Sequence, residues 1–206
     1  MKSVAGVRWH LLAVAVLGMA LGSGPPAARA AEEEPGRAVF VAKGCAVCHE
    51  ERAVLQAPHV SSLRRDRPFF ELAAAMWNHA PLMWANLSEP GLRWPRLTAR
   101  EMAALALYLK SSPQRNDPPN LSRGQAILVE KGCARCHAVQ GRGETVARDL
   151  VRHVRFDSSI AWAAAMWNHA PAMLAAGTER RLEYPQFRAA ELADLIGFLR
   201  ELGKPR

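Results

Sequence analysis

The sequence predicts an all-α protein made of two halves that share one pattern. The segments 36–49 and 124–137 match each other at an offset of 88 residues, and the run AAAMWNHAP occurs at 73–81 and again at 163–171. A pattern that recurs at nearly constant spacing indicates a duplicated module. No segment alternates between apolar and polar residues as a half-buried strand would, so each half is expected to be helical.

Residues 1–30 are expected to be a secretory signal peptide, because Lys2 and Arg8 precede the apolar run 11–21 and Ala28-Arg29-Ala30 supplies a small-x-small cleavage site. The apolar run is shorter than the about 20 residues that a spanning helix needs. We therefore expect cleavage after Ala30, a periplasmic location and no stable membrane insertion, with an uncleaved anchor as the lesser alternative.

The charges favour no nucleic-acid role. Loss of Lys2, Arg8 and Arg29 with the signal peptide lowers the formal net charge by three, from +8 to +5, and the remaining basic residues are scattered along the chain. A nucleic-acid binder usually gathers such residues into a patch. The sequence therefore predicts a mildly basic surface that is solvated.

A linker is expected between the halves, because residues 111–122 read SSPQRNDPPNLS and have no apolar periodicity. The predicted domains are residues 31–112 and 122–206, joined by 113–121. Each holds three to four helices. In the first half these are 36–43, 69–80, which Pro81 is expected to kink or end, and a last helix to Leu109. Thr98 and Glu101 form a predicted capping box at its start.

All four cysteines lie in Cys45-Ala-Val-Cys48-His49 and Cys133-Ala-Arg-Cys136-His137. The C-x-x-C-H motif is typical of c-type haem attachment, in which both thiols form thioether bonds to the porphyrin and the adjacent His binds the iron. Two disulfides in an exported protein are the alternative. A zinc site would leave each adjacent His unexplained. Two such motifs at matched places in a repeat favour covalent haem.

With these motifs, and with Leu97–Leu109 of the form LTxxEMxxLxxYL, the chain resembles the class I c-type cytochromes, and in layout their tandem two-haem members. The second half shows the last motif more loosely at 187–199. The resemblance implies two haem c groups, each wrapped by one domain, with His49 and His137 as proximal iron ligands. It also implies that the carbonyl of Pro58 orients His49, whereas the second half has Arg148 at about that place.

The sixth iron ligand is less clear, because the family's usual Met-Pro is replaced by Trp94-Pro95 and Tyr184-Pro185. Tyr184 itself is a remote candidate. Other candidates come in matched pairs from the repeated run and the residues after it. In order of preference they are Met83 and Met173, expected in a loop beyond the prolines, then His79 and His169, then Met76 and Met166, then an open site.

A haem with ligands on both faces suits one-electron transfer. We therefore expect an electron carrier, or the electron-transfer subunit of a larger oxidoreductase, that exchanges electrons with periplasmic redox proteins and is not itself an enzyme. A haem protein with a weak or open sixth position, binding a small ligand or acting as a small enzyme, is the alternative. Trp77 and Trp167 are candidates either for packing on the porphyrin or for a seam between the halves.

Overall fold

A computed structural model describes residues 26–50, 57–88, 92–112, 116–152 and 158–204. The predicted signal peptide lies largely outside these residues. No helix in the described part of the chain is long and apolar enough to cross a bilayer. The elements are α1 (Pro26–Ala42), α2 (Cys45–His49), α3 (Val60–Leu63), β1 (Arg67–Pro68), α4 (Phe69–Ser88), α5 (Ala99–Tyr108), β2 (Ser111–Ser112), α6 (Leu121–Glu130), the 3-10 turn η3 (Cys133–Arg135), α7 (Ser159–Glu179) and α8 (Ala189–Leu202).

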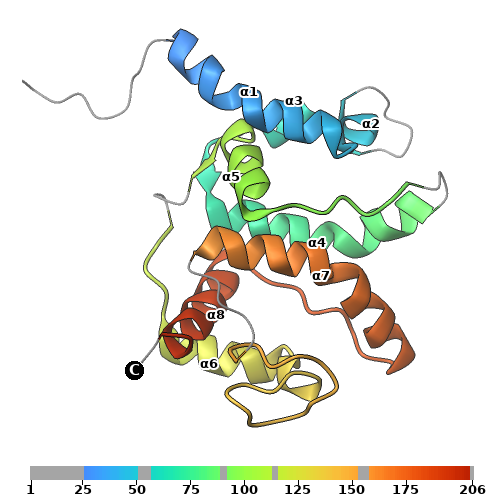
Figure 1. The fold of residues 1–206 in the computed structure, drawn as a ribbon, viewed down its shortest axis with the longest axis vertical. Coiled ribbons are helices and arrows are strands. Elements are labelled where there is room, and N and C mark those ends of the chain that lie inside the picture. The colour runs from blue at the N-terminus through green and yellow to red at the C-terminus, as the bar shows by residue number, and fades with distance from the viewer. Residues whose placement is uncertain (1–25, 51–56, 89–91, 113–115, 153–157, 205–206) are drawn as a thin grey trace, which may run out of the picture.

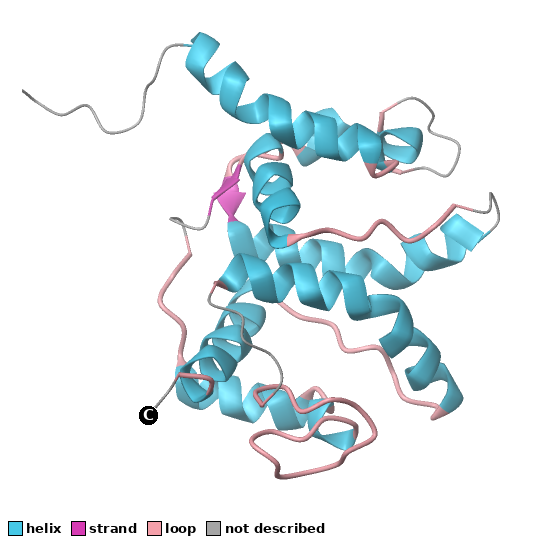
Figure 2. Cartoon of the chain, viewed as in Figure 1, coloured by secondary structure: helices cyan, strands magenta, loops and turns pink. Residues whose placement is uncertain are grey.

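The helices form three tiers, which Figure 1 shows from top to bottom. Helix α1 crosses α5 at the top, α6 crosses α8 at the bottom, and the long helices α4 and α7 lie side by side between these pairs. The predicted all-helical character is confirmed, apart from one short parallel pairing of β1 with β2 that the sequence did not indicate (Figure 2).

A glycine permits each outer helix crossing. Gly36 on α1 lies against the backbone of α5, where an added Cβ would collide with the carbonyl oxygen of Ala104. Gly124 on α6 lies in the same way against the carbonyl of Asp194 on α8. Because both helix backbones approach so closely, neither site has room for a side chain. The repeat in the sequence is thus matched by a repeated helix crossing.

The two halves interlock at the centre. Helix α4 of the first half packs on α7 and α8 of the second, and α7 packs on α4 and α5. One continuous group of buried apolar side chains draws on both halves. The middle helices thus have their main helix contacts with the opposite half, an arrangement that the expected pair of self-contained domains did not include.

Of the two outcomes expected at the prolines, a kink or an end, the end is wrong, since α4 continues through Pro81 to Ser88 and α7 continues through Pro171 to Glu179. A proline removes one backbone donor and leaves the carbonyl four residues earlier without its helical partner. In α7 that carbonyl belongs to Trp167, and it accepts a hydrogen bond from the indole Nε1 of Trp94 at 3.0 Å. A contact from the other half thus replaces the bond that the proline removes.

The described part of the predicted linker is tied to both halves. Asn116 accepts a hydrogen bond from the backbone N–H of Phe70 at 3.1 Å, at the start of α4. The N–H of Asn120 donates to Asp194 at 2.7 Å, and the Asn120 side chain caps α6. The composition correctly predicts an irregular segment. That segment is nevertheless hydrogen-bonded to both halves.

Candidate functional site

Each Cys pair begins at a glycine with a left-handed backbone. Gly44 has φ 77° and Gly132 has φ 75°, and each comes directly before the first Cys of its motif. An added Cβ at Gly44 would meet nothing within 4 Å, so conformation, not space, selects glycine there. The glycine ends the preceding helix and turns the chain so that the Cys-x-x-Cys-His segment coils beneath it in both halves.

The four thiols are free in the structure, so the disulfide alternative receives no support from it. Burial raises the pKa of Cys45 and of Cys133 to about 11. Both side chains are half-buried against the core.

One ring nitrogen of each motif His is held by a backbone carbonyl. His49 Nδ1 lies 2.9 Å from the carbonyl oxygen of Pro58, the contact that the resemblance implied. His137 Nδ1 lies 2.8 Å from the carbonyl oxygen of Arg148. A proton on Nδ1 donated to that oxygen leaves the Nε2 lone pair free for a metal, which is the usual orientation of a metal-bound imidazole. The carbonyl serves equally well whether it comes from proline or arginine.

In the second half, an acidic residue follows directly after Arg148, whose carbonyl holds His137, and fixes the surrounding loop. Asp149 accepts hydrogen bonds from four backbone N–H groups, those of Gln140, Gly141, Val151 and Arg152. Burial raises the pKa of Asp149, but these donors outweigh it, so the net pKa is lowered. At the matching position His59 only caps the short helix α3. This role was not predicted; the available signal was the Gly-rich stretch QGRGET at 140–145, which contains two more residues than the matching part of the first half.

A second imidazole lies close to the motif His of the second half. The ring centres of His137 and His169 are 6.2 Å apart, with their planes inclined at 66°. Burial and then the neighbouring His137 lower the pKa of His169, and burial and then His49 lower that of His79. Two imidazoles bound to one iron through bonds of about 2 Å, the usual metal–imidazole length, would have ring centres about 6 Å apart. The separation of His137 and His169 therefore matches that of two axial imidazoles on one iron.

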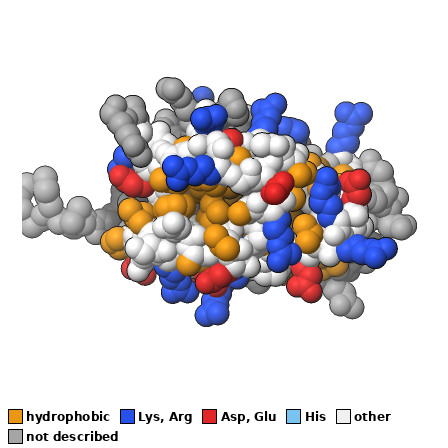
Figure 3. Space-filling model, turned by 90° about the horizontal axis from the view of Figure 1, so that it is seen from below, with side chains coloured by type: hydrophobic (Ala, Val, Ile, Leu, Met, Phe, Trp, Pro, Cys, Tyr) orange, Lys and Arg blue, Asp and Glu red, His pale blue; other side chains and the backbone are white. Residues whose placement is uncertain are grey.

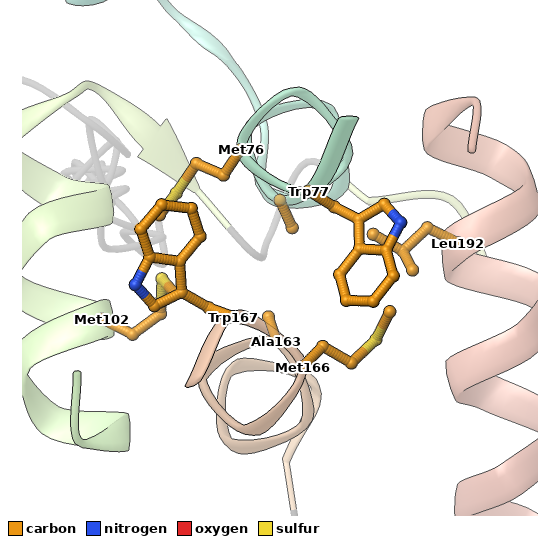
Figure 4. A pocket seen from close by; sticks show the side chains of 8 residues that line it. Met76, Trp77, Met102, Ala163, Met166, Trp167 and Leu192 are labelled. Atoms are coloured by element: carbon orange, nitrogen blue, oxygen red, sulfur yellow. The ribbon is translucent and has the colours of Figure 1, made fainter. Parts of the chain in front are cut away.

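The methionine candidates are arranged differently. Because α4 and α7 continue past their prolines, Met83 and Met173 lie one helical turn beyond His79 and His169, in helix and not in the expected loop. They are half-buried against the core. Met76 and Met166 line a small pocket between α4 and α7 (Figure 4), so they point into the contact between the halves.

The Trp-Asn pair of each repeated run binds the opposite half. Trp77 Nε1 donates to the carbonyl of Pro185 and Trp167 Nε1 to that of Pro95, both at 2.6 Å. Figure 4 shows the two indoles on opposite sides of the central pocket. Of the two roles considered for these tryptophans, the seam between the halves is the one the structure shows.

Each asparagine makes a double contact across the seam. Asn78 Nδ2 donates to the carbonyl of Phe187 at 2.8 Å, and its Oδ1 accepts from the Phe187 N–H at 2.9 Å. Asn168 binds both backbone groups of Leu97 in the same way, at 2.7 and 2.8 Å. Sequence reasoning missed these contacts, although the exact recurrence of Trp-Asn beside His was a signal for them.

The surface around the second Cys pair is mixed. Val129 and Val146 are exposed there, and the view from below shows apolar side chains among charged ones of both signs (Figure 3). No single-sign field dominates that face of the molecule.

Comparison with known proteins bears on the second half. Residues 121–203 match the family model of cytochrome c. The matched range contains the second C-x-x-C-H motif, α7 with His169, and α8, and it supports covalently bound haem c and haem-based electron transfer for this part of the chain. No curated protein and no solved structure gave a significant match. The first half lies outside the matched range and is linked to it by the repeat.

Proposed function

We propose that the chain is an exported two-haem cytochrome c that carries single electrons, either as a free carrier or as the electron-transfer subunit of an oxidoreductase. The observation that carries this proposal is the pair of imidazoles, His137 and His169, facing each other at 6.2 Å. An iron held on both faces has no open position for a substrate, so its chemistry is the gain and loss of one electron.

The count of two haems rests on the match between the halves. Gly44 and Gly132 share a backbone conformation, His49 and His137 share a carbonyl contact, and each half places a second His on the middle helix. In this proposal Cys45, Cys48, Cys133 and Cys136 hold the porphyrins, and His79 and His169 are the sixth ligands in place of Met83 and Met173. Bis-imidazole ligation implies lower redox potentials than ligation by His and Met.

Export to the periplasm follows from the predicted signal peptide, and haem attachment in that compartment is consistent with it. The mixed surface suits brief encounters with other redox proteins, because complementary charges raise the rate of association more than the affinity. Partners of this kind, small carriers or a larger oxidoreductase, are part of the proposal.

Purification from a host that matures c-type cytochromes tests the proposal. We expect haem staining to survive denaturation, the pyridine haemochrome to give two haem c per chain, and voltammetry to show two reversible one-electron steps. Rapid carbon monoxide binding by the reduced protein at both haems would instead favour the small-ligand or enzyme alternative. Loss of haem on denaturation would contradict covalent attachment.

A further inference from the structure

The residue directly before each candidate sixth ligand belongs to the seam. Asn78 precedes His79 on α4, and Asn168 precedes His169 on α7. Each asparagine binds both the N–H and the carbonyl of one residue in the opposite half. Two bonds in opposite directions to one backbone unit restrict both the position of the helix and its rotation about its axis.

Rotation matters because a ligand on a helix moves with it. One residue corresponds to about 100° of turn in a helix of 3.6 residues, so a small rotation takes an imidazole out of line with the motif His. Working sites hold their groups within about 0.5 Å of the productive geometry. Helix α7 has its larger contacts with α4 and α5, not with α8 of its own half. Its orientation is therefore set mainly from outside its own module.

We propose that Asn78 and Asn168 are positioning residues, through which each half holds the sixth iron ligand of the other half. This inference rests on the proposed function, since it assumes haem iron between the facing imidazoles. Neither asparagine touches the iron. Each acts through the histidine that follows it.

A continuous set of contacts connects one haem site with the other. Leu97, which Asn168 binds, directly precedes Thr98, the N-cap of α5. Glu101 in the first turn of α5 forms an ion pair at 2.8 Å with Lys43, two residues before Cys45. The attachment turn of the first half is thus linked to the helix that carries His169.

The experiment uses the full-length holoprotein with Asn168→Ala, Asn78→Ala and the double variant. The probe is carbon monoxide added to the reduced protein, which binds only where the sixth position opens. Loss of two hydrogen bonds of ordinary net strength should raise the population of the open form roughly 30-fold at the haem concerned. We expect each single variant to bind carbon monoxide at one haem and the double variant to bind it at both. The wild type should bind it at neither haem.

Two further variants separate positioning from general loss of stability. Asn168→Asp keeps an acceptor for the Leu97 N–H but sets a carboxylate oxygen against the Leu97 carbonyl, so it should open the haem at least as much as Asn168→Ala does. Asn86→Ala makes the same substitution on α4, seven residues beyond His79, and should leave both haems closed. Electron paramagnetic resonance of the oxidised variants provides a second readout, since each single substitution should alter one of two low-spin signals and spare the other.

Folded Asn78→Ala and Asn168→Ala proteins with wild-type resonance signals and no carbon monoxide binding would overturn the inference and leave the electron-carrier function intact. A wild-type protein that already binds carbon monoxide at both haems would instead refute the closed sites on which that function rests. The two failures are therefore distinguishable.

Discussion

The two prolines of the central helices leave matching carbonyls without helical partners, and the two halves treat this differently. In the second half, Trp94 donates an indole N–H to the carbonyl of Trp167 at 3.0 Å. In the first half the matching carbonyl is that of Trp77, and the residue equivalent to Trp94 is Tyr184. The Tyr184 hydroxyl is buried without a hydrogen-bond partner among the described residues. Its ring still stacks on Trp77 at 4.7 Å, as Trp94 packs on Trp167 at 4.3 Å.

The comparison separates two contributions to the seam. Both sides keep the aromatic contact, which needs only ring area and flat shape. Only one side keeps the hydrogen bond that compensates for the proline. Burial also raises the pKa of Tyr184, so its hydroxyl stays neutral as well as unpartnered. The side with Tyr184 is thus the weaker one, and each prediction below changes one term of this comparison.

The largest effect is expected at the outer crossings, which the two halves share. Gly124→Ala would drive a methyl group into the carbonyl of Asp194, and Gly36→Ala would do the same at Ala104. We expect each to lower the free energy of unfolding by about 3 kcal/mol, the upper range for overpacking. Urea titrations followed by circular dichroism measure this change.

Gly177→Ala provides the control for that experiment, because an added Cβ there would meet the carbonyl of Leu182 at an ordinary 3.4 Å. It should be neutral or stabilising by about 0.5 kcal/mol, as alanine replaces glycine in a helix. Equal behaviour of all three variants would show that the close crossings of α1 with α5 and α6 with α8 are not present.

Trp94→Phe should break the stronger side of the seam. The ring contact with Trp167 is retained, while the carbonyl of Trp167 loses its donor in a part-buried place. A buried polar group left unpaired costs about 1–3 kcal/mol, and we expect unfolding free energy to fall by that amount. An unchanged midpoint in thermal unfolding would contradict the role assigned to this bond.

Tyr184→Phe tests the weaker side of the seam, where we expect the change in stability to have the opposite sign. Removing a buried hydroxyl that has no partner should leave stability unchanged or raise it by about 1 kcal/mol. Tyr184→Trp should raise it further, if the new indole N–H reaches the carbonyl of Trp77 as Trp94 reaches that of Trp167. Differential scanning calorimetry of both variants beside Trp94→Phe gives the comparison directly. A marked loss of stability in Tyr184→Phe would reveal a partner for the hydroxyl.

The smallest effect concerns acid. The hydrogen bond from the backbone N–H of Arg188 lowers the pKa of Glu191. Burial raises this pKa and Lys131 lowers it, so the net pKa is lowered. Because the folded pKa lies below the unfolded value of about 4.3, this carboxylate stabilises the fold above that pH, and the contribution is lost as pH falls through the folded pKa. Glu191→Gln should therefore cost about 1 kcal/mol at neutral pH, and this cost should disappear as the pH falls through the folded pKa of Glu191. A cost that persists in acid would contradict the ionic origin.

Much of the molecule was predictable from local pattern. Thr98 and Glu101 form the predicted capping box, and the carbonyl of Pro58 holds His49. These features depend on residues a few positions apart, or on a motif with fixed geometry. The match to cytochrome c supports haem chemistry for the second half only.

What could not be predicted depends on contacts between distant residues. The hydrogen bond that compensates for Pro171 in α7 comes from an indole 73 positions earlier than the carbonyl it binds. The Trp-Asn pairs are conspicuous as a repeat, but their partners, such as Leu97, are backbone groups, which leave no mark in the sequence. Contact between the halves was predicted only as one of two roles for Trp77 and Trp167, and the asparagine bonds that complete it were missed.

The central claim is that two imidazoles hold each iron, one from the attachment turn and one from a helix fixed by the opposite half. Near-infrared magnetic circular dichroism of the fully oxidised protein tests it most directly, because the charge-transfer band reports the axial ligand pair. We predict bis-imidazole bands from both haems and no band of methionine-ligated iron. A methionine band accounting for either haem would assign Met83 or Met173 to the iron and contradict the claim.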